Sequence, residues 1–258
     1  MTAASGDGGL RGRAEALLAR HVPGRPLVLP NVWDAASARD VVAAGFPAVA
    51  TSSAAVAETL GYADHEQTPP AEMFAAVGRI ARAVDVPVTA DAEAGYGLDA
   101  SELVERLLGV GAVGCNLEDT DHAHGGRVPA PEQAARIAAV SAAAGAAGVP
   151  VVVNARIDSW LHPGSEDDRL ADALERARRY RDAGAACVFP ILLTDLAAIA
   201  RMVEVAAVPV NVLRWPGGTP LADLAAAGVA RISHGGSLFH QQQEHWRSAL
   251  GALASQLP

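Results

Sequence analysis

Acidic side chains gather where two short apolar runs of the sequence end. Asp91 and Glu93 close one run, and Glu118 closes the next. Residues two apart on a strand leave the same face, so Asp91 and Glu93 would point together, with Glu118 projecting toward them. Three such carboxylates would repel one another unless a hard cation lay between them. All-oxygen ligation favours Mg²⁺, with Mn²⁺ as the second choice. The alternative is that one of these acids caps a helix or pairs with an arginine.

Arg156 and two serines are candidates for binding an anion. Arg156 follows another apolar run, and its planar guanidinium suits a substrate carboxylate. A buried ion pair with an acid such as Asp158 is the alternative role. Ser52 and Ser53 could offer hydroxyl and N–H groups to an anion, or could be ordinary turn residues.

The chain contains no lysine, because all 20 of its basic residues are arginine. Schiff-base aldolases, pyridoxal phosphate enzymes and P-loop nucleotide hydrolases each need a lysine for chemistry or phosphate contact. The composition therefore excludes these three classes.

Eight apolar runs must position these residues. Gly follows several helical stretches, as at Gly45 and Gly184, and Pro introduces other runs, as at Pro87 and Pro150. The runs cover 27–32, 48–53, 87–92, 113–119, 150–157, 186–192, 208–213 and 229–234. Segments with helical periodicity, such as Pro70 to Val84 and Glu166 to Asp182, lie between them. Alternating apolar strands and helices predict a parallel sheet covered by helices. Eight units in 258 residues favour a closed (β/α)8 TIM-type barrel over an open sheet.

Composition supports one domain. Half of the residues are hydrophobic, which is enough for a single continuous core. We expect a disordered tail over residues 1–9, one barrel domain over residues 10–258, and a leading helix from Leu10 to His21.

The charge balance limits the partners. The net charge of −9 and the pI of about 5.3, without a basic cluster, predict no binding to nucleic acid or membrane. No secretory or membrane-spanning segment is recognisable, and Cys115 and Cys187 are expected to be buried thiols. The sequence thus predicts a cytoplasmic protein.

Taken together, the motifs resemble those of the isocitrate lyase and phosphoenolpyruvate mutase superfamily over nearly the whole chain. The Asp91-Ala-Glu-Ala-Gly-Tyr-Gly97 element with the later Glu118-Asp119 pair is the most specific likeness. The other matching stretches are Pro30 to Ala35, Thr51 to Ser53, Leu60 to Tyr62 with Asp64, and Asn154 to Asp158.

The resemblance implies a barrel whose Mg²⁺ is held directly by Asp91 and through water by Glu93 and Glu118. It implies that Asp64 lies over the substrate and that Ser52, Ser53, Arg156 and Asn211 contact it. It also implies a homo-oligomer, commonly a tetramer, in which a C-terminal helix packs on a neighbouring subunit. Leu238 to Leu257 could be that helix, or an ordinary eighth barrel helix.

Departures from the family pattern reduce the number of activities that this sequence could have. The isocitrate and methylisocitrate lyases carry a Lys-Lys-Cys-Gly-His type segment in the loop after strand four, where the cysteine is the acid. Here that loop, Asp121 to Arg127, has neither Cys nor Lys. The lysine and asparagine of the phosphoenolpyruvate mutase loop are missing too. His122 or His124 could supply a proton instead, or could be solvated loop histidines, and His234 could be a polar substrate contact.

Three functions stay open. The first is a Mg²⁺-dependent lyase that cleaves a C–C bond or decarboxylates a small anionic 2-oxo acid or substituted malate through an enolate. The second is a phosphonate enzyme of the phosphoenolpyruvate mutase or phosphonopyruvate hydrolase type. The third is a barrel that binds a metabolite without catalysis.

Overall fold

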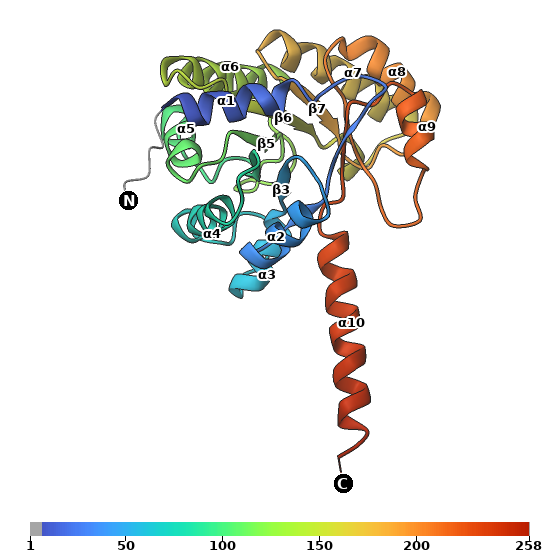
Figure 1. The fold of residues 1–258 in the computed structure, drawn as a ribbon. Coiled ribbons are helices and arrows are strands. Elements are labelled where there is room, and N and C mark those ends of the chain that lie inside the picture. The colour runs from blue at the N-terminus through green and yellow to red at the C-terminus, as the bar shows by residue number, and fades with distance from the viewer. Residues whose placement is uncertain (1–6, 258) are drawn as a thin grey trace.

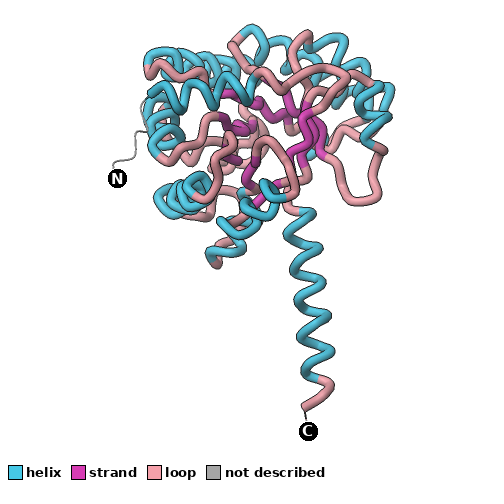
Figure 2. The backbone as a smooth tube through the Cα atoms, viewed as in Figure 1, coloured by secondary structure: helices cyan, strands magenta, loops and turns pink. Residues whose placement is uncertain are grey.

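Parallel strands form a closed ring surrounded by helices. The computed structural model describes residues 7–257, and within them the strands occupy the centre and the helices the outside (Figures 1 and 2). The hydrogen-bonded order is β2-β3-β4-β5-β6-β7 in one sheet and β1-β9-β8 in the other. A parallel bridge between Val188 and Val210 joins the two sheets. The predicted (β/α)8 TIM-type barrel is therefore confirmed.

The elements follow the predicted alternation. The strands are β1 Leu27–Leu29, β2 Asn31–Val32, β3 Val49–Thr51, β4 Val88–Asp91, β5 Gly114–Glu118, β6 Val152–Ile157, β7 Cys187–Pro190, β8 Asn211–Leu213 and β9 Arg231–Ser233. The helices are α1 Asp7–Leu18, α2 Ala35–Ala43, α3 Ser53–Leu60, α4 Pro70–Arg82, α5 Ala100–Gly109, α6 Ala130–Ala146, η1 Ser159–Leu161, α7 Glu166–Asp182, α8 Leu196–Ala206, α9 Leu221–Ala226 and α10 Ser237–Ala254.

The first apolar run forms two strand segments rather than one. Pro30 separates β1 from β2, because proline has no N–H to donate to a neighbouring strand. β1 pairs with β9, and β2 pairs with β3. The two segments together fill one position of the barrel and close the ring.

Burial of the strands on both sides holds the barrel together. All five residues of β5 are buried, and Leu117, Ile157 and Ile232 are among the fully buried core residues. Each such side chain contributes about 1.5–3 kcal/mol relative to its exposed state. Because every strand is parallel, all carboxyl ends open at one mouth, where the acids follow the apolar runs.

Both terminal helices differ from the predictions in detail. Residues 1–6 of the predicted tail lie outside the described residues, whereas Asp7–Gly9 belong to α1. The helix therefore begins three residues earlier than predicted and ends at Leu18 instead of His21. Helix α10 extends away from the barrel (Figure 1), with Trp246, Leu250 and Leu253 exposed. At its base Phe239 is buried and its ring lies 5.2 Å from that of Trp33.

Two simpler predictions concern the cysteines and the membrane. Cys115 and Cys187 are buried free thiols, as predicted. Among residues 7–257, no helix has both the length and the apolar character needed to cross a bilayer.

Candidate active site

A cavity of about 210 Å³ opens at the carboxyl ends of the strands. Its polar side is contributed mainly by β2 to β6 and the segments that follow them, and its apolar side by η1, β7 and β8. The polar side chains that line it are Asn31, Ser52, Ser53, Asp64, Asp91, Asn116, Arg156 and Ser233. A hollow of about 290 Å³ lies beside α2 and α10, but it holds none of the predicted site residues. The strand-end cavity is therefore the candidate active site.

Asp91 is held in the cavity by hydrogen bonds to Thr51, Ser53 and Asn116. Its Oδ2 accepts hydrogen bonds from the backbone N–H of Ser53 at 3.0 Å and from the Ser53 hydroxyl at 2.9 Å. Its Oδ1 accepts one from Asn116 Nδ2 at 3.1 Å. The backbone N–H of Asp91 donates to Thr51 Oγ1 at 2.8 Å. These contacts fix the orientation of the carboxylate, so Ser53 positions Asp91 in addition to lining the cavity.

Glu93 sits in a strained turn behind the cavity. Its backbone is in the left-handed region, with φ of 47°, a conformation that costs energy for a residue other than glycine. Its carboxylate accepts hydrogen bonds from the Tyr96 hydroxyl at 2.5 Å and the Glu66 N–H at 2.6 Å. Burial raises the pKa of Glu93 to about 7; Tyr96 opposes that shift, whereas the charge of Asp91 adds to it.

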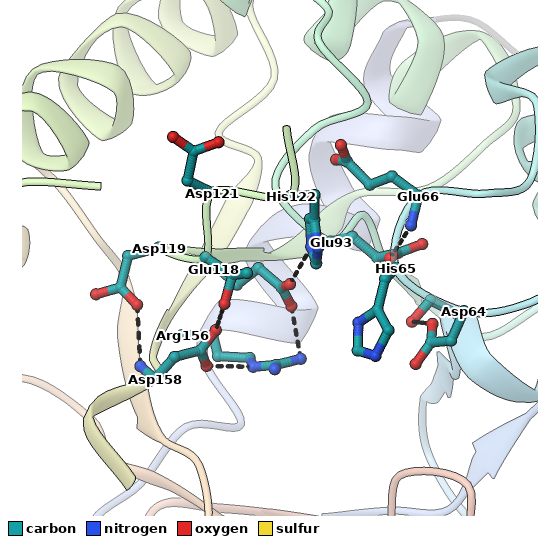
Figure 3. A network of polar contacts seen from close by, with 12 residues as sticks. Asp64, His65, Glu66, Glu93, Glu118, Asp119, Asp121, His122, Arg156 and Asp158 are labelled. Carbon is teal, nitrogen blue, oxygen red and sulfur yellow. Dashed lines mark hydrogen bonds and ion pairs between the residues drawn. The ribbon is translucent and has the colours of Figure 1, made fainter. Parts of the chain in front are cut away.

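Glu118 joins the cavity to the loop that follows β5 (Figure 3). Its Oε2 lies 2.5 Å from Nη1 of Arg156, and its Oε1 lies 2.7 Å from Nε2 of His122. Burial raises the pKa of Glu118, while Arg156 and His122 act in the opposite direction. The hydrogen bond to Glu118 in turn raises the pKa of His122.

The three acids form a cation site only in part. Between residues 7 and 257 no group of three or more His, Cys, Asp or Glu side chains is placed to hold one metal directly. Asp91 lines the cavity, whereas Glu93 and Glu118 do not. Direct ligation of one ion by all three side chains is therefore not seen among the described residues, and ligation through water by Glu93 and Glu118 stays a prediction.

The donor set nevertheless fits a divalent cation bound at Asp91. The charge of Asp91 raises the pKa of both Glu93 and Glu118, so the three carboxylates lie close enough to act on one another. Arg156 is the one cationic side chain among the described residues that line the cavity. Excess negative charge with oxygen donors is what Mg²⁺ or Mn²⁺ would neutralise.

Three other predicted residues, Asp64, Ser52 and Arg156, line the cavity. Asp64 lines the cavity, with its Oδ1 3.5 Å from the Ser53 hydroxyl. Ser52 lines it as well, although its hydroxyl also caps α3 by accepting from the Ala55 N–H. Arg156 lines the cavity and also forms the buried ion pair suggested as its alternative role, with its Nε donating to Asp158 Oδ1 at 2.6 Å; binding of a substrate carboxylate stays a prediction. These three residues thus lie where a substrate could contact them.

Asn211 and His234 do not line the cavity, in contrast to the prediction. Asn211 is fully buried, and its Nδ2 donates to Ser233 Oγ at 3.1 Å. His234 uses its backbone N–H to contact Asn31 Oδ1, and burial lowers the pKa of its ring. Both were misplaced because the sequence fixes where a strand ends but not the side to which each end residue turns.

The two loop histidines have different surroundings. The side chain of His122 is 10% exposed and contacts Glu118, with its ring 5.5 Å from that of His65. The side chain of His124 is 84% exposed and contacts only Asp121 among the described residues. His122 is therefore part of the site network, and the alternative of a solvated loop histidine holds for His124.

Sequence reasoning missed a buried arginine beneath the cavity. Arg231 is fully buried, and its Nη2 donates to Asn116 Oδ1 at 3.2 Å. Asn116 links this guanidinium to Asp91, because its Nδ2 donates to the Asp91 carboxylate. An arginine inside the apolar run 229–234 was the signal that could have identified it, since an unpaired buried charge is costly.

Comparison with known proteins places the chain among related enzymes. Residues 17–254 match the family described as phosphoenolpyruvate phosphomutase. An uncharacterised protein of Mycobacterium tuberculosis is 33% identical over 216 residues, which cover 83% of this chain and 80% of that protein.

Two solved structures are similar along almost the whole chain. A crystal structure from Burkholderia cenocepacia, described as a candidate phosphonomutase, has 42% sequence identity and a TM-score of 0.87, covering 95% of this chain and 99% of that one. The structure of 2,3-dimethylmalate lyase, described as a PEP mutase/isocitrate lyase superfamily member, has 26% identity and a TM-score of 0.84, covering 95% and 88%. The predicted superfamily is therefore confirmed: this chain belongs to the phosphoenolpyruvate phosphomutase family of the PEP mutase/isocitrate lyase superfamily.

Proposed function

We propose that this protein is a Mg²⁺-dependent lyase that breaks a C–C bond, by cleavage or decarboxylation, beside the carbonyl of a small 2-oxo acid or substituted malate. The observation that carries the proposal is that Asp91 and Arg156 line one small cavity at the mouth of the barrel. Proteins with similar folds include 2,3-dimethylmalate lyase and oxaloacetate acetylhydrolase, both of which act on such acids.

Each residue has a role in this proposal. Arg156 binds the carboxylate of the substrate and stabilises negative charge as an enolate forms. Ser52 and Asp64 orient the substrate from the polar wall. Asp91 would hold Mg²⁺ directly, with Glu93 and Glu118 acting through water. The bound ion would supply positive charge next to the substrate oxygen.

We assign the proton donor to His122 rather than to His124. His122 does not itself line the cavity; its Nε2 contacts Glu118, and Glu118 contacts Arg156 on the cavity wall. Because Glu118 raises the pKa of His122, more of its ring is protonated at neutral pH than in a free histidine. A positioned acid of this kind contributes about 10²–10⁴-fold to a rate.

The test is a panel of 2-oxo acids and substituted malates, with oxaloacetate first, followed with and without Mg²⁺. The proposal expects turnover that requires Mg²⁺ and is lost in Asp91→Ala, together with metal binding measured by calorimetry. Asp40→Ala, a change at an acid outside the cavity, is the matched control. Full activity of Asp91→Ala in metal-depleted buffer would refute the proposal. Binding without turnover across the panel would favour the non-catalytic barrel.

A phosphonate enzyme is the second candidate, because the Burkholderia cenocepacia structure with 42% identity is described as a candidate phosphonomutase. Phosphorus NMR of phosphonopyruvate separates the two functions. Only a phosphonate enzyme changes the signal of the C–P bond, whereas a C–C lyase leaves it intact.

We also propose that the protein forms a homo-oligomer in the cytoplasm through α10. That helix extends from the barrel with Trp246, Leu250 and Leu253 exposed, and apolar surface of this kind is characteristic of interfaces. Light scattering of the wild type and of Leu253→Arg tests this proposal. We expect the substitution to lower the mass of the particle.

A further inference from the structure

The wall of the cavity opposite Asp91 is apolar. It is formed by η1, by β7 and the turn that follows, and by β8 and its following turn. Its side chains are Leu161, Phe189, Ile191, Leu192, Leu213 and Trp215. Phe189 and Leu213 are buried, whereas Leu161 and Trp215 are 48% and 44% exposed. The apolar wall thus has a buried base and an open rim.

No positively charged side chain among the described lining residues belongs to the apolar wall. Among the described lining residues Arg156 alone is positively charged, and it lies on the polar side. Its Nε and Nη1 already contact Asp158 and Glu118. A second carboxylate set against the apolar wall would lose its water without gaining a partner, which is strongly unfavourable.

Arg214, which lies between two residues of the apolar wall in the sequence, Leu213 and Trp215, does not reach the cavity. Its Nε donates to the Thr219 carbonyl at 2.8 Å, and its Nη2 lies 3.4 Å from the Gly218 carbonyl. This guanidinium is therefore engaged by the backbone of its own loop.

The polar groups on the adjoining edge are also engaged. The Ser233 hydroxyl and the Asn211 side chain exchange hydrogen bonds at 3.1 and 3.2 Å. The wall from β7 to β8 consequently offers apolar surface, with its nearest polar side chains bonded to one another.

We propose that the substrate carries an uncharged alkyl or aryl substituent on the end that faces the apolar wall, so that the enzyme acts on branched or alkyl-substituted acids rather than on those with a further carboxylate there. The inference rests on the proposed function, which supplies the carboxylate and the carbonyl at the polar side. The rim residues Leu161 and Trp215 would be covered by this substituent, which favours binding by removing apolar surface from water.

A pair of acids of equal size tests the inference. 2-Oxoglutarate and 5-methyl-2-oxohexanoate share the 2-oxo acid end and differ in carrying a carboxylate or an isopropyl group at the other. Binding of each is measured by calorimetry in the presence of Mg²⁺. We expect the branched acid to bind at least about tenfold more tightly, since a single methylene in an apolar pocket changes selectivity about 10–200-fold.

The outcomes separate this inference from the proposed function. Tighter or equal binding of 2-oxoglutarate would overturn the apolar-substituent proposal while leaving the 2-oxo acid site in place. Binding of neither acid would overturn this inference, while the proposed function would still be decided by turnover in the panel that includes substituted malates.

A charge placed on the rim should reverse the preference. In Trp215→Arg, 2-oxoglutarate should gain affinity and the branched acid should lose it. Trp215→Glu should weaken binding of both acids, because it adds negative charge to a cavity that already holds Asp64 and Asp91. Leu18→Arg, at a residue of similar exposure (41%) in α1, should leave the ratio of the two affinities unchanged. An unchanged ratio in Trp215→Arg would contradict the proposal.

Discussion

Glu118 is the last residue of β5 and Asp119 follows it, but their carboxylates point in different directions (Figure 3) and have different main partners. Glu118 contacts Arg156 and His122 at the mouth of the barrel. Asp119 turns to α7, where its Oδ2 accepts from Arg176 Nη1 at 2.9 Å and from the Tyr180 hydroxyl at 2.6 Å. Adjacent residues leave opposite faces of a strand, so one acid serves the site and the other attaches a helix to the barrel.

The two sets of contacts, one at the mouth and one, the outer network, at α7, meet at Asp158. Its backbone N–H donates to Asp119 Oδ1 at 2.9 Å, and its carboxylate accepts from Arg156. The outer network therefore supports the arginine that lines the cavity. Similar residue types thus have different consequences: contacts to α7 should govern stability, and contacts at the mouth should govern activity.

The largest expected effect is on stability, in Asp119→Ala. The change removes one carboxylate partner of the buried Arg176, which keeps its contact with Asp172 at 3.2 Å. Loss of one partner of a buried pair costs up to about 3–5 kcal/mol, and the remaining contact should hold the loss at the lower end of that range. Urea unfolding measures the free energy of unfolding. Exposed Glu102, which pairs with Arg106 at 3.0 Å, gives the control Glu102→Ala, for which we expect less than about 1 kcal/mol. If both variants lost the same free energy of unfolding, the outer network would not have the stabilising role assigned to it.

Glu118→Gln should affect catalysis instead. It removes the negative charge between Arg156 and His122, and loss of one such electrostatic contact typically lowers kcat about 10²–10³-fold. We expect a smaller loss of stability than in Asp119→Ala, because the side chains of Arg156 and His122 are 16% and 10% exposed and water can reach them. The comparison would fail if Glu118→Gln unfolded more readily than Asp119→Ala while retaining its kcat.

Acid should weaken the outer network through Asp172, whose Oδ1 accepts a hydrogen bond from Arg176 Nε at 3.2 Å. Burial would raise the pKa of Asp172, but hydrogen bonds from Arg127 and Ser159 outweigh it and hold the pKa below its usual value. A carboxyl whose pKa is lower in the folded state stabilises the protein above its unfolded pKa, about 3.9 for Asp. That contribution disappears as the pH falls through the folded pKa.

We therefore expect the free energy of unfolding of the wild type to fall between pH 5 and pH 3, and to fall less in Asp172→Asn. Urea unfolding at several pH values measures this difference. Parallel curves for the two proteins would show that Asp172 does not carry the acid sensitivity.

The smallest effect is expected for His124→Ala. The side chain of His124 is exposed and contacts Asp121, so the free energy of unfolding should change by less than about 0.5 kcal/mol, and kcat/KM should be unchanged. His122→Asn in the same assay provides the contrast, with a fall in kcat of about 10²-fold or more. If kcat fell to a similar extent in both variants, His124 would have to be counted as a site residue.

The sequence alone determined the barrel and much of its mouth. Helix α7 spans Glu166–Asp182, as its periodicity predicted, and the eight apolar runs became the strand positions of the ring. Asp91 and Arg156 were identified as site residues because polar side chains at the carboxyl ends of parallel strands share one mouth. Signals of this kind are local, since they depend on periodicity and on the residues that end a helix or strand.

Only the tertiary structure decided which polar residues meet. It turned Asn211 and His234 away from the cavity, separated His122 from His124, and brought buried Arg231 beneath Asp91 through Asn116. It also assembled the apolar wall from three segments distant in sequence. The physical reason is that side-chain direction at a strand end depends on the twist and closure of the whole barrel, which no local pattern encodes.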